Sequence, residues 1–412
     1  MSSSSRSSFK RSYSSNLDIA SRQSTALVFE FGTAFLRVGI AGEPRPRHIF
    51  PLKQCQPPLQ QLQLPVQLQK KSEIESKSND QDQYNRDWIT TNPHFPSDIF
   101  ITSSNPNYHD HLGPWISNLY TNNLLLKPRS RKVLIILPIH QPPALKHALT
   151  EIFLRDLQVP SLLIVNPFRT IPYAIGNYGA GIIVDIGQIE GRVVCFFNRR
   201  MIEHTLEMVP VGYASLLNAL QHVHVNMDEQ DQEQEQDQDQ QDQVSVVNEL
   251  YFNLENTDSL LYAFMTSLLR CPVDLRKQVV QHVVFVGGGV EAIKIIEHRF
   301  LVEVQSLFEC KGTVECTVSG RGSGTVDSGT SAGTSAGTST IPNDDDHSGK
   351  RNIYRVKDDR YKKFNALASV IMNAPLGVLY PLQFRPSLMV WMGASIMGSI
   401  KLSKDEWIDR SD

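Results

Sequence analysis

A strand that ends in an acid, one further residue and a glycine occurs twice in this chain. Glu30 closes the first such strand, at residues 27–32, and Asp185 closes the second, at residues 179–187. Each strand is followed by another apolar run, which predicts the return strand of a hairpin. One copy alone would be an ordinary hairpin with an acidic turn. Two copies in one chain indicate an internal duplication in which both turns face a shared site.

Such a turn suits the binding of a charged ligand. The acid can face a metal ion, and the glycine lets backbone N–H groups approach a phosphate. A third glycine turn, Gly287 to Gly289, joins a predicted strand at residues 282–286 to a predicted helix at residues 291–305. The N–H groups at the start of such a helix also suit a phosphate or the edge of a nucleotide, although glycine turns of this kind are common.

Between the two hairpins the sequence alternates between strand and helix patterns. The apolar runs at residues 132–137 and 161–165 predict buried parallel strands. Residues 142–157 carry apolar positions at helical spacing, and Asn166 followed by proline is typical of a helix start. This order predicts an α/β core with right-handed crossovers.

Helical patterns also occupy much of the second part of the chain. We predict helices over residues 248–269 and directly after Cys271-Pro-Val-Asp. Near the end, small residues recur at helical spacing over residues 388–400. This pattern predicts a core helix that packs very close to its neighbour.

Composition limits the class of protein. The chain has 412 residues, of which 41% are hydrophobic, and this is enough for a sizeable core. A net charge of -3 gives no overall attraction to nucleic acid or to acidic membrane, so neither is an expected partner. Five cysteines without a C-x-x-C pair favour a reducing compartment. No apolar run reaches the roughly 18 residues of a membrane helix, and we expect a soluble cytoplasmic protein.

Three stretches have compositions that cannot bury a core. We predict that residues 1–25 form a disordered Ser-rich tail, with a mitochondrial presequence as the less favoured alternative. Residues 226–243 alternate acids with glutamine, and residues 311–352 are rich in Gly, Ser and Thr. Both are predicted to be low-complexity, disordered tracts.

Residues 52–111 are rich in Gln, Pro and Asn and predict an irregular insertion. His109 and His111 within it have the spacing of a metal-binding pair, but no further ligand lies near them in the sequence. A solvated loop is therefore the favoured interpretation of the two histidines.

Four segments, in the same order over residues 26–410, resemble motifs of actin and the actin-related proteins. They read LVFEFGTAFLRVGIAGEPRPRHIFP, GIIVDIGQIEGRVV, CPVDLRKQVVQHVVFVGGG and MVWMGASIMGSI. The first two are similar to the family's phosphate loops, the third to its adenosine-side glycine loop and the fourth to its late helix. The resemblance implies an α/β actin-like fold, with two duplicated α/β subdomains around a nucleotide cleft and reduced or disordered peripheral subdomains.

The resemblance also implies a division of the chain. Residues 26–174 would form the first actin-like half and residues 175–375 the second. Residues 376–412 would then return to the first half.

Within the family, the chain looks most like the branch that ends the short actin-like filament of dynactin at its pointed end. The stretches PRSRKVLII, QVPSLL and CPVDLRKQ carry this likeness. It implies a cytoplasmic, cytoskeletal protein that supports dynein-driven transport along microtubules, with actin-like filament subunits and other dynactin subunits as partners. The alternative is an actin-related scaffold of a nuclear chromatin-remodelling complex. A sugar kinase or chaperone ATPase is discouraged by the altered phosphate loops.

The matched motifs imply a site for ATP or ADP with Mg²⁺, held as a structural ligand. Glu30 and Asp185 would face the metal. The residues implied to contact the nucleotide are Gly32, Thr33, Ala34, Arg37, Asp185, Gly187, Gly287, Gly288 and Gly289.

Four departures from the family pattern bear on hydrolysis. Gln188 stands at a second aspartate position and Ile189 at a glycine position, where its branched side chain is expected to crowd the backbone. Phe168 stands where actins carry the glutamine that positions the attacking water, and Arg192 where they carry a histidine. Phenylalanine cannot hydrogen bond to a water, so we predict a non-enzymatic protein without significant ATP hydrolysis. An empty pseudo-site is the second interpretation.

Overall fold

The computed structural model describes residues 25–51, 107–176, 178–225, 245–293, 296–315, 350–374, 376–378 and 384–409. The predictions for residues 1–24 and 226–243 lie outside these ranges, as do most of those for residues 52–111 and 311–352. The predicted reduction of the peripheral subdomains falls largely in these stretches. Within the described residues no helix has the length and hydrophobicity to cross a membrane.

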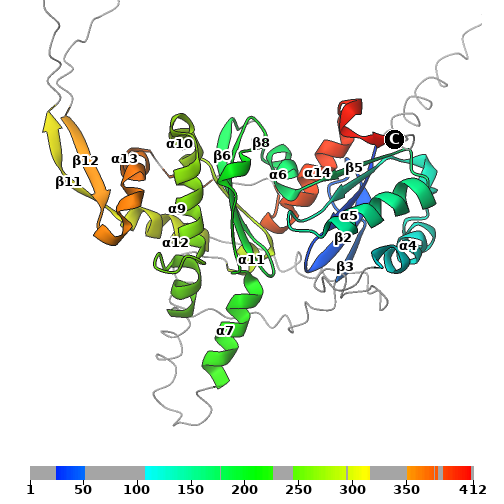
Figure 1. Cartoon of the computed structure of the whole chain (residues 1–412), viewed down its shortest axis with the longest axis horizontal. Coiled ribbons are helices and arrows are strands. Elements are labelled where there is room, and N and C mark those ends of the chain that lie inside the picture. The colour runs from blue at the N-terminus through cyan, green and yellow to red at the C-terminus, as the bar shows by residue number, and fades with distance from the viewer. Residues whose placement is uncertain are drawn as a thin grey trace, which may run out of the picture.

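In the described part of the chain, two large β-sheets, a two-stranded sheet and layers of helices build the molecule (Figure 1). The first sheet has the order β13 (Ile408–Asp409), β5 (Ser161–Val165), β4 (Val133–Ile136), β1 (Leu27–Phe31), β2 (Phe35–Ile40) and β3 (His48–Pro51). The second has the order β10 (Val283–Val286), β6 (Ala180–Ile186), β7 (Gly191–Phe197) and β8 (Arg200–Met201), and β9 (Glu207–Val209) also pairs with β7. Strands β1, β4, β6 and β10 are buried throughout, which explains their unbroken apolar runs.

The two sheets share one topology, as the repeated motif predicts. In the first, the antiparallel hairpin β1–β2 lies beside the parallel strand β4. In the second, the hairpin β6–β7 lies beside the parallel strand β10. A parallel bridge between Val283 and Val378 extends the second sheet on the side where β5 extends the first.

Helices cover the outer faces of both sheets. On the first sheet these are α4 (Tyr108–Asn118) and α5 (Pro143–Thr150), each continued by a π-helical turn, at Leu119–Leu124 and Glu151–Asp156. On the second they are α9 (Leu260–Arg270), α10 (Val273–Val280), α12 (Ile296–Ser306) and α13 (Asn365–Asn373). Helix α7 (Tyr213–Val225) follows β9.

The central layer is a pair of helices, α6 (Pro167–Ile175) and α14 (Met389–Ser399), that packs between the sheets (Figure 1). Their shared core joins Val28 and Ile136 of the first sheet to Ile183 and Val286 of the second. The prediction of a closely packed helix near the chain end is confirmed, because a side chain on Gly393 would meet the Thr170 carbonyl oxygen. This layer joins the two halves through one continuous core.

The long helix predicted over residues 248–269 is interrupted. A π-helical turn occupies Asn248–Phe252, and α9 begins only at Leu260. Asn253 and Asn256 each accept a hydrogen bond from the N–H group two residues on, at 2.9 and 3.0 Å. Such local bonds compete with helix formation. Ser259 then caps α9 by accepting from the Tyr262 N–H at 3.1 Å.

The boundaries of two predicted irregular stretches were wrong. Strands β11 (Phe308–Glu315) and β12 (Lys350–Val356) form an antiparallel pair at the two ends of the tract at residues 311–352. Pairing of the backbone outweighs the polar composition there. Residues 108–111 belong to α4, and His109 Nε2 lies 2.7 Å from Asp156 Oδ2 rather than in a solvated loop.

The helix predicted over residues 291–305 is also divided. The structure has a short helix, α11 (Gly288–Ala292), that includes two of the three glycines, and then α12 from Ile296. Gly287 precedes α11 with a φ of 100°, a backbone conformation that glycine adopts without strain.

Candidate functional site

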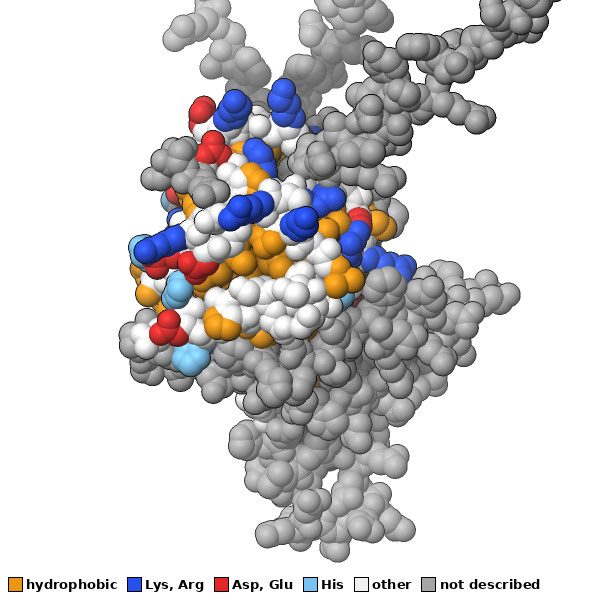
Figure 2. Space-filling model, turned by 90° about the vertical axis from the view of Figure 1, so that its right-hand side faces the viewer, with side chains coloured by type: hydrophobic (Ala, Val, Ile, Leu, Met, Phe, Trp, Pro, Cys, Tyr) orange, Lys and Arg blue, Asp and Glu red, His pale blue; other side chains and the backbone are white. Residues whose placement is uncertain are grey.

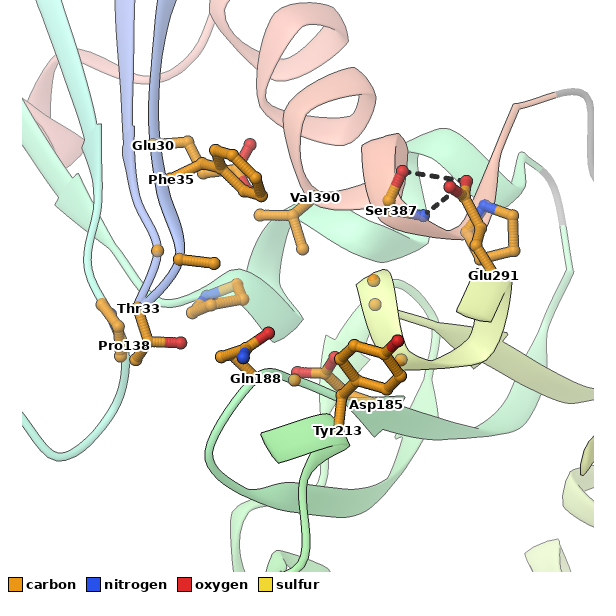
Figure 3. A pocket seen from close by; sticks show the side chains of 18 of the residues that line it. Glu30, Thr33, Phe35, Pro138, Asp185, Gln188, Tyr213, Glu291, Ser387 and Val390 are labelled. Atoms are coloured by element: carbon orange, nitrogen blue, oxygen red, sulfur yellow. Dashed lines mark hydrogen bonds between the residues drawn. The ribbon is translucent and has the colours of Figure 1, made fainter. Parts of the chain in front are cut away.

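A cavity of about 380 Å³ lies where the two hairpin turns and the start of α11 meet (Figure 3). Both halves of the molecule line it. It brings together every residue predicted to contact a nucleotide, namely Gly32, Thr33, Ala34, Arg37, Asp185, Gly187, Gly287, Gly288 and Gly289. Glu30, predicted to face a metal, lines it as well. The volume is at the lower end of the range of about 300–1,000 Å³ that small-molecule sites occupy.

The first turn is held tight by glycine. The N–H group of Gly32 donates to the Phe35 carbonyl oxygen at 2.9 Å, and a Cβ on Gly32 would lie 2.9 Å from that oxygen. Thr33 therefore stands at the tip of the turn, beside Pro138 from the loop after β4 (Figure 3).

The second turn is braced by the start of α7. The Gly187 N–H donates to the Glu190 carbonyl oxygen at 3.0 Å, and the N–H groups of Tyr213 and Ala214 donate to the carbonyl oxygens of Gly187 and Gln188. Ile189 is 46% exposed and does not line the cavity. Our expectation that its side chain crowds the site was therefore wrong.

The third turn packs directly on β6. A Cβ on Gly287 would lie 2.3 Å from the Ile186 carbonyl oxygen and 2.6 Å from Asp185 Oδ1. The Gly287 N–H donates to the Pro386 carbonyl oxygen at 3.0 Å, which ties this turn to the segment leading into α14. Only glycine allows so close an approach to the acid.

Each of the two hairpin acids is paired with an arginine from its own hairpin. Arg37 Nη1 donates to Glu30 Oε1 at 2.5 Å, and Arg192 Nη1 donates to Asp185 Oδ2 at 2.9 Å. Arg192 also donates to Glu190 through Nε at 2.8 Å. The pKa of the Glu30 and Asp185 carboxyl groups is raised above its ordinary value, because burial outweighs the opposing effect of the neighbouring arginine.

The two acid–arginine pairs affect whether Glu30 and Asp185 can bind the predicted magnesium ion. Both acids are buried, and a guanidinium that cannot lose its proton already balances each of them. Among the described residues no three His, Cys, Asp or Glu side chains gather in a metal-binding group. The acids therefore do not fit a magnesium site of the predicted kind.

A polar ligand fits the same cavity better than an ion does. Glu30 Oε2 and Arg37 Nε are buried and have no hydrogen-bond partner among the described residues. The first hairpin therefore offers one hydrogen-bond acceptor and one hydrogen-bond donor to a ligand in the cavity. Gly288 faces open space, since a Cβ there would meet no atom within 4 Å.

Phe168, at the position of the family's water-positioning glutamine, does not reach the cavity. Its side chain is fully buried in the core between the sheets, whereas its neighbour Pro167 lines the site.

The sequence reasoning missed several residues that line the cavity. These are Phe35, Pro138, Tyr213, Leu217, Glu291, Ser387 and Val390. Glu291 accepts a hydrogen bond from the Ser387 hydroxyl at 2.8 Å and so joins α11 to the segment before α14 (Figure 3). Ser387 and Val390 do not belong to a sequence motif that would indicate a binding site. Only the close packing predicted for residues 388–400 could have indicated that this segment reaches the site.

Two duplicated α/β halves around a cleft lined by three glycine turns define the actin-like fold. The family model described as Actin matches residues 21–259, which is more than half of the chain, and the chain belongs to this family. Among curated proteins it is similar to Actin-related protein 10 of Dictyostelium discoideum, with 22% identity over 197 residues. That alignment covers 48% of this chain and 39% of the relative, so the match spans about two fifths of the relative's length.

Proposed function

We propose that this chain is a structural actin-related subunit that ends a short actin-like filament at its pointed end, in a dynactin-type complex, and that it does not hydrolyse ATP. The observation that supports the absence of hydrolysis is the position of Phe168, whose side chain is buried in the core. A fully buried phenyl ring supplies no hydrogen bond to a water in the cleft. Positioning of that water is a main contribution of the protein to phosphoryl transfer.

In this proposal an adenine nucleotide is a structural ligand. The turns at Gly32 and Gly187 would hold its phosphates, and the turn at Gly288 would lie on its adenosine side. Tyr213 and Leu217 line the side of the cavity next to α11. Because the cavity is lined by both halves, a ligand there would stabilise the folded state by mass action and would join the halves. The nucleotide itself would supply no chemistry beyond this linkage.

The proposed end position follows from the way actin-like subunits associate. Head-to-tail contacts continue indefinitely unless one face of a subunit is changed. The stretches that would build the pointed face, residues 52–111 and 226–243, are rich in Gln, Pro, Asn and acids instead of being patterned for a compact unit. A subunit that keeps its opposite face would bind a filament and refuse the next subunit.

A cationic and apolar surface on the first half is a candidate for the retained contact. No acid occurs over residues 111–150, and Leu125 is 78% exposed with a left-handed φ of 51°. Figure 2 shows Lys and Arg side chains gathered over this side of the molecule, with a band of hydrophobic side chains across it. An exposed leucine on a strained backbone, in a stretch of chain that carries basic residues and no acid, suits a protein contact.

The test is to add the purified protein to polymerising actin-like subunits and to follow both filament ends. We expect growth to stop at one end only. Leu125→Asp should weaken this arrest at least about tenfold, the effect of losing about 1.4 kcal/mol of binding. The matched control is Val273→Asp, since Val273 is similarly exposed at the start of α10 on the second half. Unaffected growth at both ends would contradict the proposal.

A further inference from the structure

The two acid–arginine pairs of the cleft occupy the same place in the two hairpins. Arg37 lies directly opposite Glu30 across β1 and β2, and Arg192 lies directly opposite Asp185 across β6 and β7. Side chains at directly opposite positions of an antiparallel pair lie on the same face and about 4.5–5.5 Å apart at Cβ. The strand register, and not a chance side-chain rotamer, therefore brings each arginine to its acid.

The pairs satisfy charges that would otherwise be costly to bury. Glu30 and Asp185 are buried, Arg192 is buried with Asp185, and Arg37 is partly buried. A buried carboxylate needs a counter-charge and hydrogen bonds, and each acid receives both from its own hairpin. Each of the two buried acids therefore has a fixed cation beside it, although Arg192 shares its charge between Asp185 and Glu190.

A divalent ion would also meet fixed positive charge here. Magnesium and calcium sites in proteins are built from oxygen ligands that carry excess negative charge. Any ion close to Glu30 or Asp185 would lie close to a guanidinium that cannot be deprotonated. The remaining carboxylate that lines the cavity, Glu291, accepts from the Ser387 hydroxyl and comes from the far side of the site (Figure 3).

We propose that Arg37 and Arg192 take the place of a divalent cation in this cleft, so that the protein keeps its fold, and holds any ligand of the cleft, without magnesium or calcium. The proposal does not depend on whether a nucleotide binds. It predicts that the stability of the protein does not depend on a divalent cation while both arginines are present. Removing one arginine should make the stability depend on such a cation.

Thermal unfolding of the purified full-length chain tests this, in EDTA and in excess Mg²⁺ or Ca²⁺, with and without ADP. A bound ion at about 100-fold above its dissociation constant would raise the Tm by several degrees. We expect the wild type to show no such shift. Arg192→Gln leaves Asp185 and Glu190 without their cation, and it should unfold at a lower temperature in EDTA and recover when Mg²⁺ or Ca²⁺ is added.

The matched control is the double variant Asp185→Asn with Arg192→Gln, in which a neutral pair replaces the ion pair. It should not respond to the ions, and Mn²⁺ titration should find a bound ion in Arg192→Gln only. If Arg192→Gln does not fold, Arg37→Gln and the Glu30→Gln/Arg37→Gln double variant serve in the same way. Stabilisation of the wild type by Mg²⁺ would overturn the proposal, and so would a folded single variant that does not respond to either ion. If the wild-type protein did not arrest filament growth, the proposed function would be contradicted, but the expected response of the Tm to cations would be unchanged.

Discussion

Gly393→Ala is expected to lower the free energy of unfolding by about 3 kcal/mol, because the new methyl group would force two helices apart. A Cβ at this position would lie 2.0 Å from the carbonyl oxygen of Thr170 and 2.4 Å from its carbonyl carbon. Both are backbone atoms of α6, so no side-chain rotation relieves the clash. Alanine gains about 1 kcal/mol of helix propensity over glycine, and this is too little to offset it.

Urea denaturation of the full-length chain measures this loss. The matched control is Gly288→Ala in α11, where an added Cβ meets nothing within 4 Å and φ is not positive. This control should stay within about 0.5 kcal/mol of the wild type. Equal stabilities of the two variants would show that α6 and α14 do not pack as closely as the structure has them.

Phe168→Gln is expected to cost about 3–5 kcal/mol of stability and to restore no hydrolysis. The substitution gives back the residue type that actins carry, but it places an amide among Ile171, Val284 and Trp391 in the core between the sheets. The lost aromatic packing and the buried, unpaired amide both act against folding. The expected result is a folded but destabilised variant, measured by urea denaturation.

Phe168→Leu is the matched control, because it keeps the site apolar and should cost only about 1–1.5 kcal/mol. A Phe168→Gln variant as stable as the wild type would place this side chain at the cleft and not in the core.

The buried strands and the glycine turns could be read from the sequence. Strands such as β4 and β10 are buried on both faces, so their apolar runs are unbroken, and Gly287 marks a turn where only glycine fits against Asp185. The repeated hairpin motif then indicated correctly that turns far apart in the sequence would meet.

Features that depend on the register between strands could not be read in this way. Arg37 and Arg192 each follow their acid by seven residues, but only the pairing of the strands shows that they lie opposite it. The sequence therefore suggested two acids free to face a metal, and it gave no sign that an arginine lies beside each of them. Likewise, the polar tract at residues 311–352 conceals the pairing of β11 with β12, because local composition does not report contacts between its two ends.

Phosphate release by the purified wild-type chain in ATP and Mg²⁺ tests most directly the proposed absence of ATP hydrolysis in this actin-family cleft. We expect release that equals the background without protein. Phosphate release at a rate comparable to that of a filament-forming actin would contradict the account.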